Sequence, residues 1–207
     1  MIPLFVDCSK KRVVIFGGGD VAARKAGHFT GQAELVMASR SFSDACKALP
    51  ARFIALDTRT SPDSALEKLV TSAFLVIAAL SDRDENDRIG KIAGRRGILF
   101  NNADGEPGDV VIPAISAGKN YTFAVTTGGE SPAVARFVRQ KVETDLPTLD
   151  AMIELQHKAR EALRGRTTEQ AGRREVLREI LDDKKVWELL GQSPGLAWEY
   201  VNGRYLA

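Results

Sequence analysis

A short segment near the N-terminus has the residue types and spacing of a nucleotide-binding loop. It consists of Gly17, Gly18, Gly19, Asp20, Val21 and Ala22. These residues fit G-x-G-x-x-A, in which the first glycine permits a tight turn, the second lets the backbone approach a pyrophosphate, and the alanine lets the helix pack close to the strand. Free N–H groups at the start of that helix attract phosphates. The pattern therefore predicts a dinucleotide site.

The expected acidic partner of such a loop is missing. A dinucleotide site usually has Asp or Glu at the end of its second strand, where the carboxylate binds the ribose hydroxyls. Here the second predicted strand, residues 34–38, is followed by Ser39, Arg40 and Ser41. Arg40 could accept the 2′-phosphate of NADP, stack on adenine, or lie in solvent. The residues alone leave the choice between NAD and NADP open.

Asp104 is a candidate for acid–base chemistry. It lies in the run Asn101-Asn102-Ala103-Asp104-Gly105, after the fifth apolar run. Ligands of open α/β sheets bind beyond the carboxyl ends of the strands. A carboxylate in that zone can accept a proton or hold a cationic nitrogen. The alternative is a turn-forming residue, because Asp-Gly is a common turn pair.

A second glycine-containing loop covers residues 126–132, Thr-Thr-Gly-Gly-Glu-Ser-Pro. Ser131 as N-cap and Pro132 at the first helical position predict that a helix starts here. Gly128 and Gly129 expose backbone N–H groups, which makes the loop a second candidate anion site. The alternative is an ordinary capped loop.

These loops need a scaffold, and the first half of the chain supplies a regular one. Short apolar runs typical of buried parallel strands lie at residues 13–16, 35–38, 53–56, 74–79 and 98–100. Helical patterns lie between them at residues 21–29, 42–49, 63–70 and 84–95. Ser81, three residues before Asp84, has the spacing of a helix-start signal. The alternation predicts an α/β fold with a doubly wound parallel sheet.

The pattern changes beyond residue 102. Residues 110–112 and 121–126 have the composition of strands, with a turn near residues 117–120. Residues 133–143 predict a helix with one apolar stripe. The stripe consists of Val134, Phe137, Val138 and Val142.

From Asp150 onward the sequence is helical and highly charged. Thr167 with Gln170 is a candidate helix start. The aromatic residues of this segment are expected to pack in a small core rather than to stack on a ligand. They are Trp187, Trp198 and Tyr200.

Composition excludes several classes of protein. The 207 residues carry a net charge of +2, too little to indicate nucleic acid binding. The two cysteines and two histidines form neither a disulfide framework nor a cluster with metal-ligand spacing. The longest apolar run, residues 73–80, is too short to span a bilayer, and the N-terminus lacks the basic start of a signal peptide. We expect a cytoplasmic protein with no resident metal and with no nucleic acid or membrane partner.

Familiar enzyme signatures are also missing. A short-chain dehydrogenase needs Tyr-x-x-x-Lys, but Tyr121 is followed by Val125 and Tyr200 by Arg204. The chain has no G-x-S-x-G elbow and no P-loop lysine after its glycines. Two scattered histidines argue against a Ser/His/Asp triad.

Taken together, the motifs resemble one family. Pro3-Leu4-Phe5 and residues 14–25, Val-Ile-Phe-Gly-Gly-Gly-Asp-Val-Ala-Ala-Arg-Lys, are similar to the start of precorrin-2 dehydrogenases, the dehydrogenase/ferrochelatase modules of sirohaem synthesis. The similarity covers residues 1–145, with the motifs in the family's order. The later motifs are residues 78–82 with Asn86, residues 102–104, residues 112–114, and residues 126–133 with Arg136.

The resemblance implies NAD-dependent oxidation of precorrin-2 to sirohydrochlorin, and in some members insertion of Fe²⁺ to give sirohaem. It implies a Rossmann-type NAD-binding domain over residues 1–113, a dimerisation segment over 114–149 and a helical domain over 150–207. The family arrangement is a homodimer with the active site between subunits. No metal-ligand cluster is needed for iron insertion, since the macrocycle itself supplies the nitrogen ligands.

The resemblance also implies roles for particular residues. Asp104 matches the position most closely tied to catalysis, and we expect it to take a proton from the macrocycle or to orient pyrrole N–H groups. The glycine loop, Arg40 and Ser41 match the cofactor contacts. Precorrin-2 carries eight carboxylates, which call for N–H groups and basic side chains. The expected substrate contacts are Asn102, Thr126, Gly128, Gly129, Ser131 and Arg136.

The sequence departs from the family where Thr126-Thr127 replaces frequent serines, and Asn101-Asn102 is a variation. Two alternatives stay open. A regulatory NAD-sensing module would bind the nucleotide without turnover. A different NAD(P) oxidoreductase for another polyanionic substrate would transfer a hydride without acting on precorrin-2.

Overall fold

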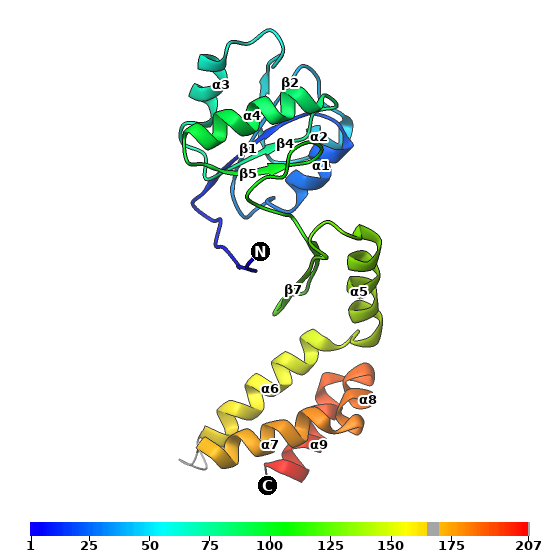
Figure 1. The fold of residues 1–207 in the computed structure, drawn as a ribbon. Helices are drawn as coiled ribbons and strands as arrows, with labels where there is room; N and C mark the ends of the chain where they lie inside the picture. The colour runs from blue at the N-terminus through cyan, green and yellow to red at the C-terminus, as the bar shows by residue number, and fades with distance from the viewer. Residues whose placement is uncertain (165–169, 207) are drawn as a thin grey trace. The chain divides into compact units, whose positions relative to one another are not determined.

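A computed structural model describes residues 1–164 and 170–206 (Figure 1). The chain divides into two compact units, Met1–Ile112 and Pro113–Ala207. The division into an NAD-binding domain, a dimerisation segment and a helical domain stays a prediction.

The first unit is a five-stranded parallel sheet in the order β3-β2-β1-β4-β5 (Figure 1). Its strands are β1 (Arg12–Phe16), β2 (Glu34–Ser39), β3 (Arg52–Ala55), β4 (Leu75–Ala78) and β5 (Leu99–Asn102). Its helices are α1 (Asp20–Gly27), α2 (Asp44–Lys47), α3 (Asp63–Val70) and α4 (Arg83–Arg95). The predicted α/β fold is confirmed, and each of the five predicted strands is present.

The two faces of the sheet are covered by different helices because side chains alternate along each strand. Val14 and Phe16 of β1 pack in one core with α3 and α4, whereas Val13 and Ile15 pack in the other with α1 and α2. The chain runs from β1 outward to β2 and β3, then returns to the other side of β1 for β4 and β5. That reversal opens a crevice at the carboxyl ends of β1 and β4, where such folds bind ligands.

Two predicted helix boundaries in this unit are wrong. Helix α4 begins after Asp82 rather than Ser81, because the Asp82 carboxylate accepts hydrogen bonds from the backbone N–H groups of Asp84 (3.1 Å) and Glu85 (3.3 Å). Helix α2 covers residues 44–47 instead of 42–49. Phe42 precedes the cap and packs edge-on against the ring of Phe53, with 4.9 Å between ring centres. Its apolar character therefore reflects tertiary packing, not helical periodicity.

The predicted strand at residues 110–112 is also wrong. The Val110 N–H donates one backbone hydrogen bond to the Phe100 carbonyl at 3.0 Å, and the Val110 carbonyl accepts from the Asn101 side chain at 2.6 Å. These bonds satisfy the segment without a ladder of strand pairing. Val110 and Ile112 pack against the core under α1 and α2. They are apolar because a loop crosses the core there.

The second unit begins with an antiparallel hairpin, β6 (Ala114–Ala117) and β7 (Thr122–Val125), followed by helix α5 (Pro132–Asp145). The carboxylate of Asp150 accepts the backbone N–H groups of Lys119 (3.0 Å) and Asn120 (2.8 Å), which fixes the hairpin turn. Ser131 caps α5 by accepting the N–H of Val134 at 3.3 Å. The predicted strand near 121–126, the turn, and the helix start at Ser131 are confirmed.

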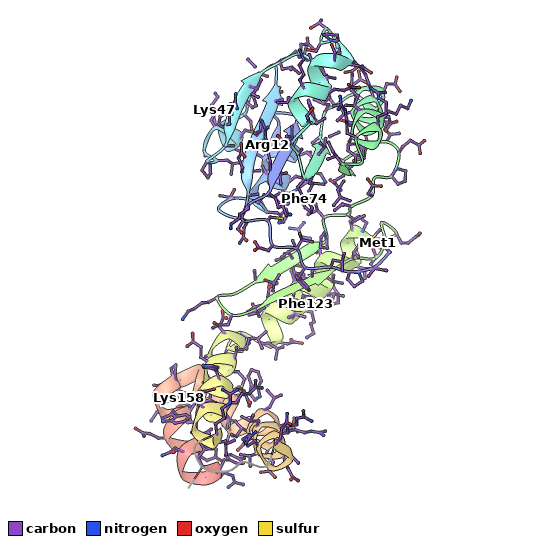
Figure 2. The ribbon with its side chains drawn as sticks, turned by 90° about the vertical axis from the view of Figure 1, so that its left-hand side faces the viewer. Met1, Arg12, Lys47, Phe74, Phe123 and Lys158 are labelled. Carbon is purple, nitrogen blue, oxygen red and sulfur yellow. The ribbon has the colours of Figure 1, made fainter. Side chains whose placement is uncertain are left out.

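Among its described residues, four helices complete this unit: α6 (Leu149–Arg164), α7 (Gln170–Asp182), α8 (Lys184–Gln192) and α9 (Pro194–Tyr205). Trp187, Trp198 and Tyr200 pack against their shared core, which confirms the structural role expected for them. The Lys158 ammonium lies 3.9 Å from the centre of the Trp198 ring. Figure 2 labels Lys158 among the helices of this unit. The candidate helix start at Thr167 lies outside the described residues. Among the residues that the structure describes, no helix is both long and apolar enough to span a membrane.

Candidate functional site

A cavity of about 780 Å³ lies at the carboxyl ends of the strands of the first unit. Segments that follow all five strands line it, at residues 17–21, 39–43, 56–59, 79–82 and 103–104. Eight of the predicted site residues are among them. They are Gly17, Gly18, Gly19, Asp20, Val21, Arg40, Ser41 and Asp104.

The glycine loop has the geometry that its pattern requires. Gly17 has φ +135°, and a Cβ there would lie 2.5 Å from the Ala79 carbonyl oxygen. Gly19 lines the cavity, and no described atom lies within 4 Å of the place where its Cβ would be. Ala22 does not line the cavity but is fully buried behind the loop, where only a small side chain fits. The backbone at Gly19 is thus open to a ligand.

Gly18 is constrained for a reason that the motif does not give. A Cβ at this position would lie 1.9 Å from the Ser41 carbonyl oxygen. The Gly18 carbonyl accepts the Ser43 N–H at 2.7 Å, and the Cys46 thiol donates to the Gly19 carbonyl at 3.6 Å. The segment after β2 therefore supports the glycine loop from behind. Sequence reasoning did not predict this contact between Gly18 and the segment after β2. The run of three consecutive glycines was the signal that could have indicated it.

The residues present fit a dinucleotide. In the part of the chain that the structure describes, no side chain caps the N-terminus of α1. Its first N–H groups have no intrahelical acceptors and can donate to phosphate oxygens. They adjoin the open backbone at Gly19 and face a cavity of ample volume. These features would hold the pyrophosphate of NAD.

Both arginines among the described lining residues have carboxylate partners. Arg40 Nη1 lies 3.9 Å from Asp57 Oδ2, and Arg59 Nη2 lies 2.9 Å from Asp82 Oδ2. The pKa of Asp82 is held below its usual value by the hydrogen bond from the Glu85 N–H and by Arg59. Sequence reasoning missed Asp57, because nothing in the local pattern links a residue after the third strand to Arg40.

Asp104 presents its carboxylate to the cavity from the loop after β5. Its Oδ1 lies 2.8 Å from Nη2 of Arg83, and the side chain is half exposed. The carboxylate in turn raises the pKa of Arg83 through this hydrogen bond. Asn102 accepts the Asp104 N–H at 3.3 Å and does not line the cavity, so it supports the loop.

Helix α4 fixes the backbone of the Asp104 loop with two more side chains. Asn86, fully buried, donates to the carbonyls of Leu80 (3.1 Å) and Asp104 (3.0 Å) and accepts the Leu80 N–H at 3.0 Å. Asp87 Oδ1 accepts from the Asn102 side chain and from the Glu106 N–H, both at 2.9 Å. The loops after β4 and β5 are therefore held together by one amide.

Replacing Asn86 by alanine should destabilise the protein by about 1–3 kcal/mol, because buried backbone groups of Leu80 and Asp104 lose their partner. Any activity that depends on the Asp104 carboxylate should fall as well, since the Asp104 backbone loses its hydrogen bond from Asn86. Denaturant unfolding measures the first effect and steady-state kinetics the second. Asn202→Ala, at an exposed amide of α9, is the matched control and should change neither. Wild-type stability in Asn86→Ala would contradict this account.

The other substrate candidates lie in the second unit, and the structure describes them relative to one another. Gly128 and Gly129 adopt φ values of +70° and +97°. Thr126 Oγ1 accepts the Gly128 N–H at 3.1 Å, and Thr127 Oγ1 accepts the Ser131 N–H at 2.9 Å. The threonine hydroxyls thus shape this loop from within, a role that sequence reasoning did not assign to Thr127.

Arg136 follows on α5, where it is exposed. Within the described residues it has no ion-pair partner. No group of three or more His, Cys, Asp or Glu side chains in residues 1–164 and 170–206 is placed to hold a metal ion.

Comparisons with known proteins agree with this geometry. The family described as "Putative NAD(P)-binding" matches residues 4–114. A precorrin-2 dehydrogenase of Methanosarcina barkeri is 38% identical over 197 residues, which cover 93% of this chain and 88% of that protein. A sirohaem synthase of Sodalis glossinidius is 31% identical over 186 residues, 88% of this chain but 39% of the synthase. The chain therefore spans about two fifths of that longer relative.

A solved structure of the precorrin-2 dehydrogenase SirC has the same fold. It superposes with a TM-score of 0.74 over 98% of this chain and 100% of its own, at 18% sequence identity. The sheet order, the glycine loop and the near full-length similarity to the Methanosarcina protein lead to one conclusion: the chain belongs to the precorrin-2 dehydrogenase family.

Proposed function

We propose that this protein oxidises precorrin-2 to sirohydrochlorin with NAD in sirohaem synthesis. The observation that carries the proposal is that one cavity holds both an open glycine loop and the Asp104 carboxylate. The reaction removes a hydride and a proton, so it needs a hydride acceptor and a base at the same place. Family membership supplies the substrate class. A purely regulatory module would have no need of a carboxylate at that position.

In this proposal the backbone at Gly19 and the N-terminus of α1 bind the pyrophosphate, and Arg40 and Ser41 lie on the ribose side of the cavity. When bound there, NAD would supply the hydride acceptor of the reaction. Asp104 takes the proton or orients pyrrole N–H groups. Arg83, at 2.8 Å, orients the Asp104 carboxylate.

The second glycine loop is proposed to bind substrate carboxylates. Thr126, Gly128, Gly129 and Ser131 shape a turn with left-handed glycines. Arg136, one turn into the following helix, is exposed and can pair with a carboxylate. Its cationic side chain suits a macrocycle that carries eight carboxylates.

Insertion of Fe²⁺ as a second substrate is also part of this proposal. The macrocycle supplies four nitrogen ligands, so the protein needs only to assist loss of their protons. Asp104 is placed to do so if the same cavity holds the product. We propose a reduced, cytoplasmic setting, which suits the two free thiols of Cys8 and Cys46.

The test is anaerobic incubation with precorrin-2 and NAD, followed by the visible spectrum of the macrocycle and the absorbance of NADH. Equal formation of sirohydrochlorin and NADH is expected. Fe²⁺ is then added, and protein-dependent acceleration of sirohaem formation supports the chelatase. Binding of NAD without conversion of precorrin-2 would favour the regulatory NAD-sensing module. Hydride transfer to NAD from another polyanion, but not from precorrin-2, would favour a different NAD(P) oxidoreductase.

We also propose a homodimer that uses the outer face of α5. Phe137 is 63% exposed and Val134 is 50% exposed on a helix whose other side contacts β6 and β7. Exposed apolar side chains of this size on one face indicate a protein partner. The family resemblance implies that the partner is a second copy.

Phe137→Glu is expected to convert the dimer to a monomer, because it places a charge in an apolar contact. Light scattering after size exclusion at micromolar concentration measures the mass. Leu181→Glu, at a 44% exposed leucine of α7, serves as the control and should stay dimeric. A wild-type protein that is monomeric in this assay would refute the homodimer.

A further inference from the structure

The end of β2 leaves a question about cofactor choice. Its sequence, Ser39-Arg40-Ser41, offers a guanidinium where a carboxylate usually binds the ribose. An unpaired arginine in this place would favour a 2′-phosphate, since guanidinium and phosphate form strong charge-assisted hydrogen bonds. The sequence by itself therefore suits NADP at least as well as NAD.

The neighbouring strand brings a carboxylate to this position. β3 runs parallel to β2, with Ser39 opposite Ala55, and the Leu56 N–H donates to the Ser39 carbonyl at 3.0 Å. Asp57 follows directly, at the same edge of the sheet. Its Oδ2 lies 3.9 Å from Nη1 of Arg40, and both residues line the cavity.

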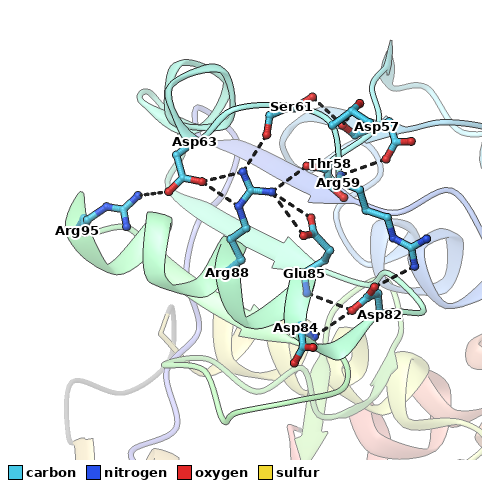
Figure 3. A network of polar contacts seen from close by, with 11 residues as sticks. Asp57, Thr58, Arg59, Ser61, Asp63, Asp82, Asp84, Glu85, Arg88 and Arg95 are labelled. Atoms are coloured by element: carbon cyan, nitrogen blue, oxygen red, sulfur yellow. Dashed lines mark hydrogen bonds and ion pairs between the residues drawn. The ribbon is translucent and has the colours of Figure 1, made fainter.

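The loop that carries Asp57 is held firmly. Arg88 of α4 donates to the carbonyls of Thr58 (2.9 Å) and Ser61 (2.8 Å) (Figure 3). The Ser61 hydroxyl donates to the Asp57 carbonyl at 2.7 Å, and the Arg59 N–H donates to Asp57 Oδ1 at 3.1 Å. The Asp57 side chain is 31% exposed. Its carboxylate is thus a fixed part of the cavity wall.

The second arginine of the wall offers no alternative phosphate site. Arg59 pairs with Asp82 at 2.9 Å, and Figure 3 shows this pair beside Arg88, with Glu85 between them. A 2′-phosphate near Arg40 would therefore meet the negative charge of Asp57 without a free cation among the described lining residues to offset it.

We infer that Asp57 makes this cavity select NAD over NADP, through its charge beside Arg40. The inference rests on the proposed nucleotide site and adds the residue that discriminates between the two cofactors. A ribose hydroxyl can donate a hydrogen bond to a carboxylate, whereas a phosphate is repelled by it. The carboxylate comes from the third strand instead of the second, and Arg40 is the group that it neutralises.

Asp57→Asn tests this inference. The asparagine side chain still offers an oxygen that can accept the Arg59 N–H, and the backbone carbonyl that accepts the Ser61 hydroxyl is unchanged. Calorimetry measures the Kd of NAD and of NADP, and of AMP and adenosine 2′,5′-bisphosphate as probes that need no turnover. The ratio of NADP to NAD affinity is expected to rise about tenfold or more. Arg40→Ala in the same background should cancel most of that gain, since Arg40 is the group that is set free.

Asp44→Asn is the matched control: it removes the same charge from α2, outside the cavity lining, and should leave the ratio unchanged. Asp57→Ser is a second variant should the first fail to fold. An unchanged ratio in a folded Asp57 variant, or an equal rise in the Asp44 control, would overturn the inference. Wild-type protein that binds neither nucleotide would overturn it together with the nucleotide site. Nucleotide selectivity without oxidation of precorrin-2 would refute the proposed function and leave the role of Asp57 intact.

Discussion

Asp104→Ala is expected to lower kcat for precorrin-2 oxidation by about 100-fold or more, the usual effect of losing a positioned acid–base group. NAD affinity should change little, because the loop after β5 is fixed by Asn86 and Asp87 through contacts that the substitution leaves in place. Only the ion pair with Arg83 is lost, and both partners are largely exposed. Single-turnover kinetics and calorimetry with NAD measure the two quantities separately.

Glu106→Ala is the matched control for this variant. It removes an acidic side chain from the same loop, and Glu106 hydrogen-bonds to Asn102 and Asp87 through its backbone carbonyl and N–H. Its kcat should stay near the wild-type value. Unchanged turnover in Asp104→Ala would remove Asp104 from the catalytic step, and a loss of NAD binding would make its role one of loop structure.

Two alanine substitutions in the glycine loop should both weaken NAD binding but differ in their effect on stability. Gly18→Ala is expected to lower the free energy of unfolding by about 1–3 kcal/mol, because its Cβ meets the Ser41 carbonyl and the loop must shift. NAD binding should be lost with it. Gly19→Ala meets no described atom within 4 Å, so stability should remain near wild type. NAD affinity should nevertheless fall, since the new methyl group occupies the space needed by the pyrophosphate.

Denaturant unfolding and calorimetry on both variants distinguish these effects. If Gly19→Ala binds NAD as tightly as wild type, the pyrophosphate does not lie against Gly19. If Gly18→Ala is as stable as wild type, the contact with the segment after β2 does not constrain the loop. The pair thus separates support of the loop from contact with the cofactor.

Local patterns in the sequence predicted the parts of the site that single segments build. Alternating apolar runs and helical stretches gave the five parallel strands, because burial on both faces requires continuous apolar sequence. The glycine spacing indicated the loop, and Ser131 with Pro132 the start of α5. The prediction failed where apolar residues serve a distant partner: Phe42 packs on Phe53, and Val110 covers the core from a loop.

The tertiary structure decided which segments share the cavity. Asp57 faces Arg40 because β3 lies beside β2, Asn86 joins two loops because α4 packs over β4 and β5, and Gly18 must be glycine because residue 41 crosses behind it. The pairs Arg40 with Asp57, Asn86 with Asp104, and Gly18 with Ser41 are each well separated along the chain. The sequence by itself determined the elements, the loop motif and the candidate base, since these depend on periodicity and neighbouring residue types. Strand order and helix packing set the charge balance at Arg40 and the support of Asp104, because they alone bring distant side chains within hydrogen-bond or ion-pair distance.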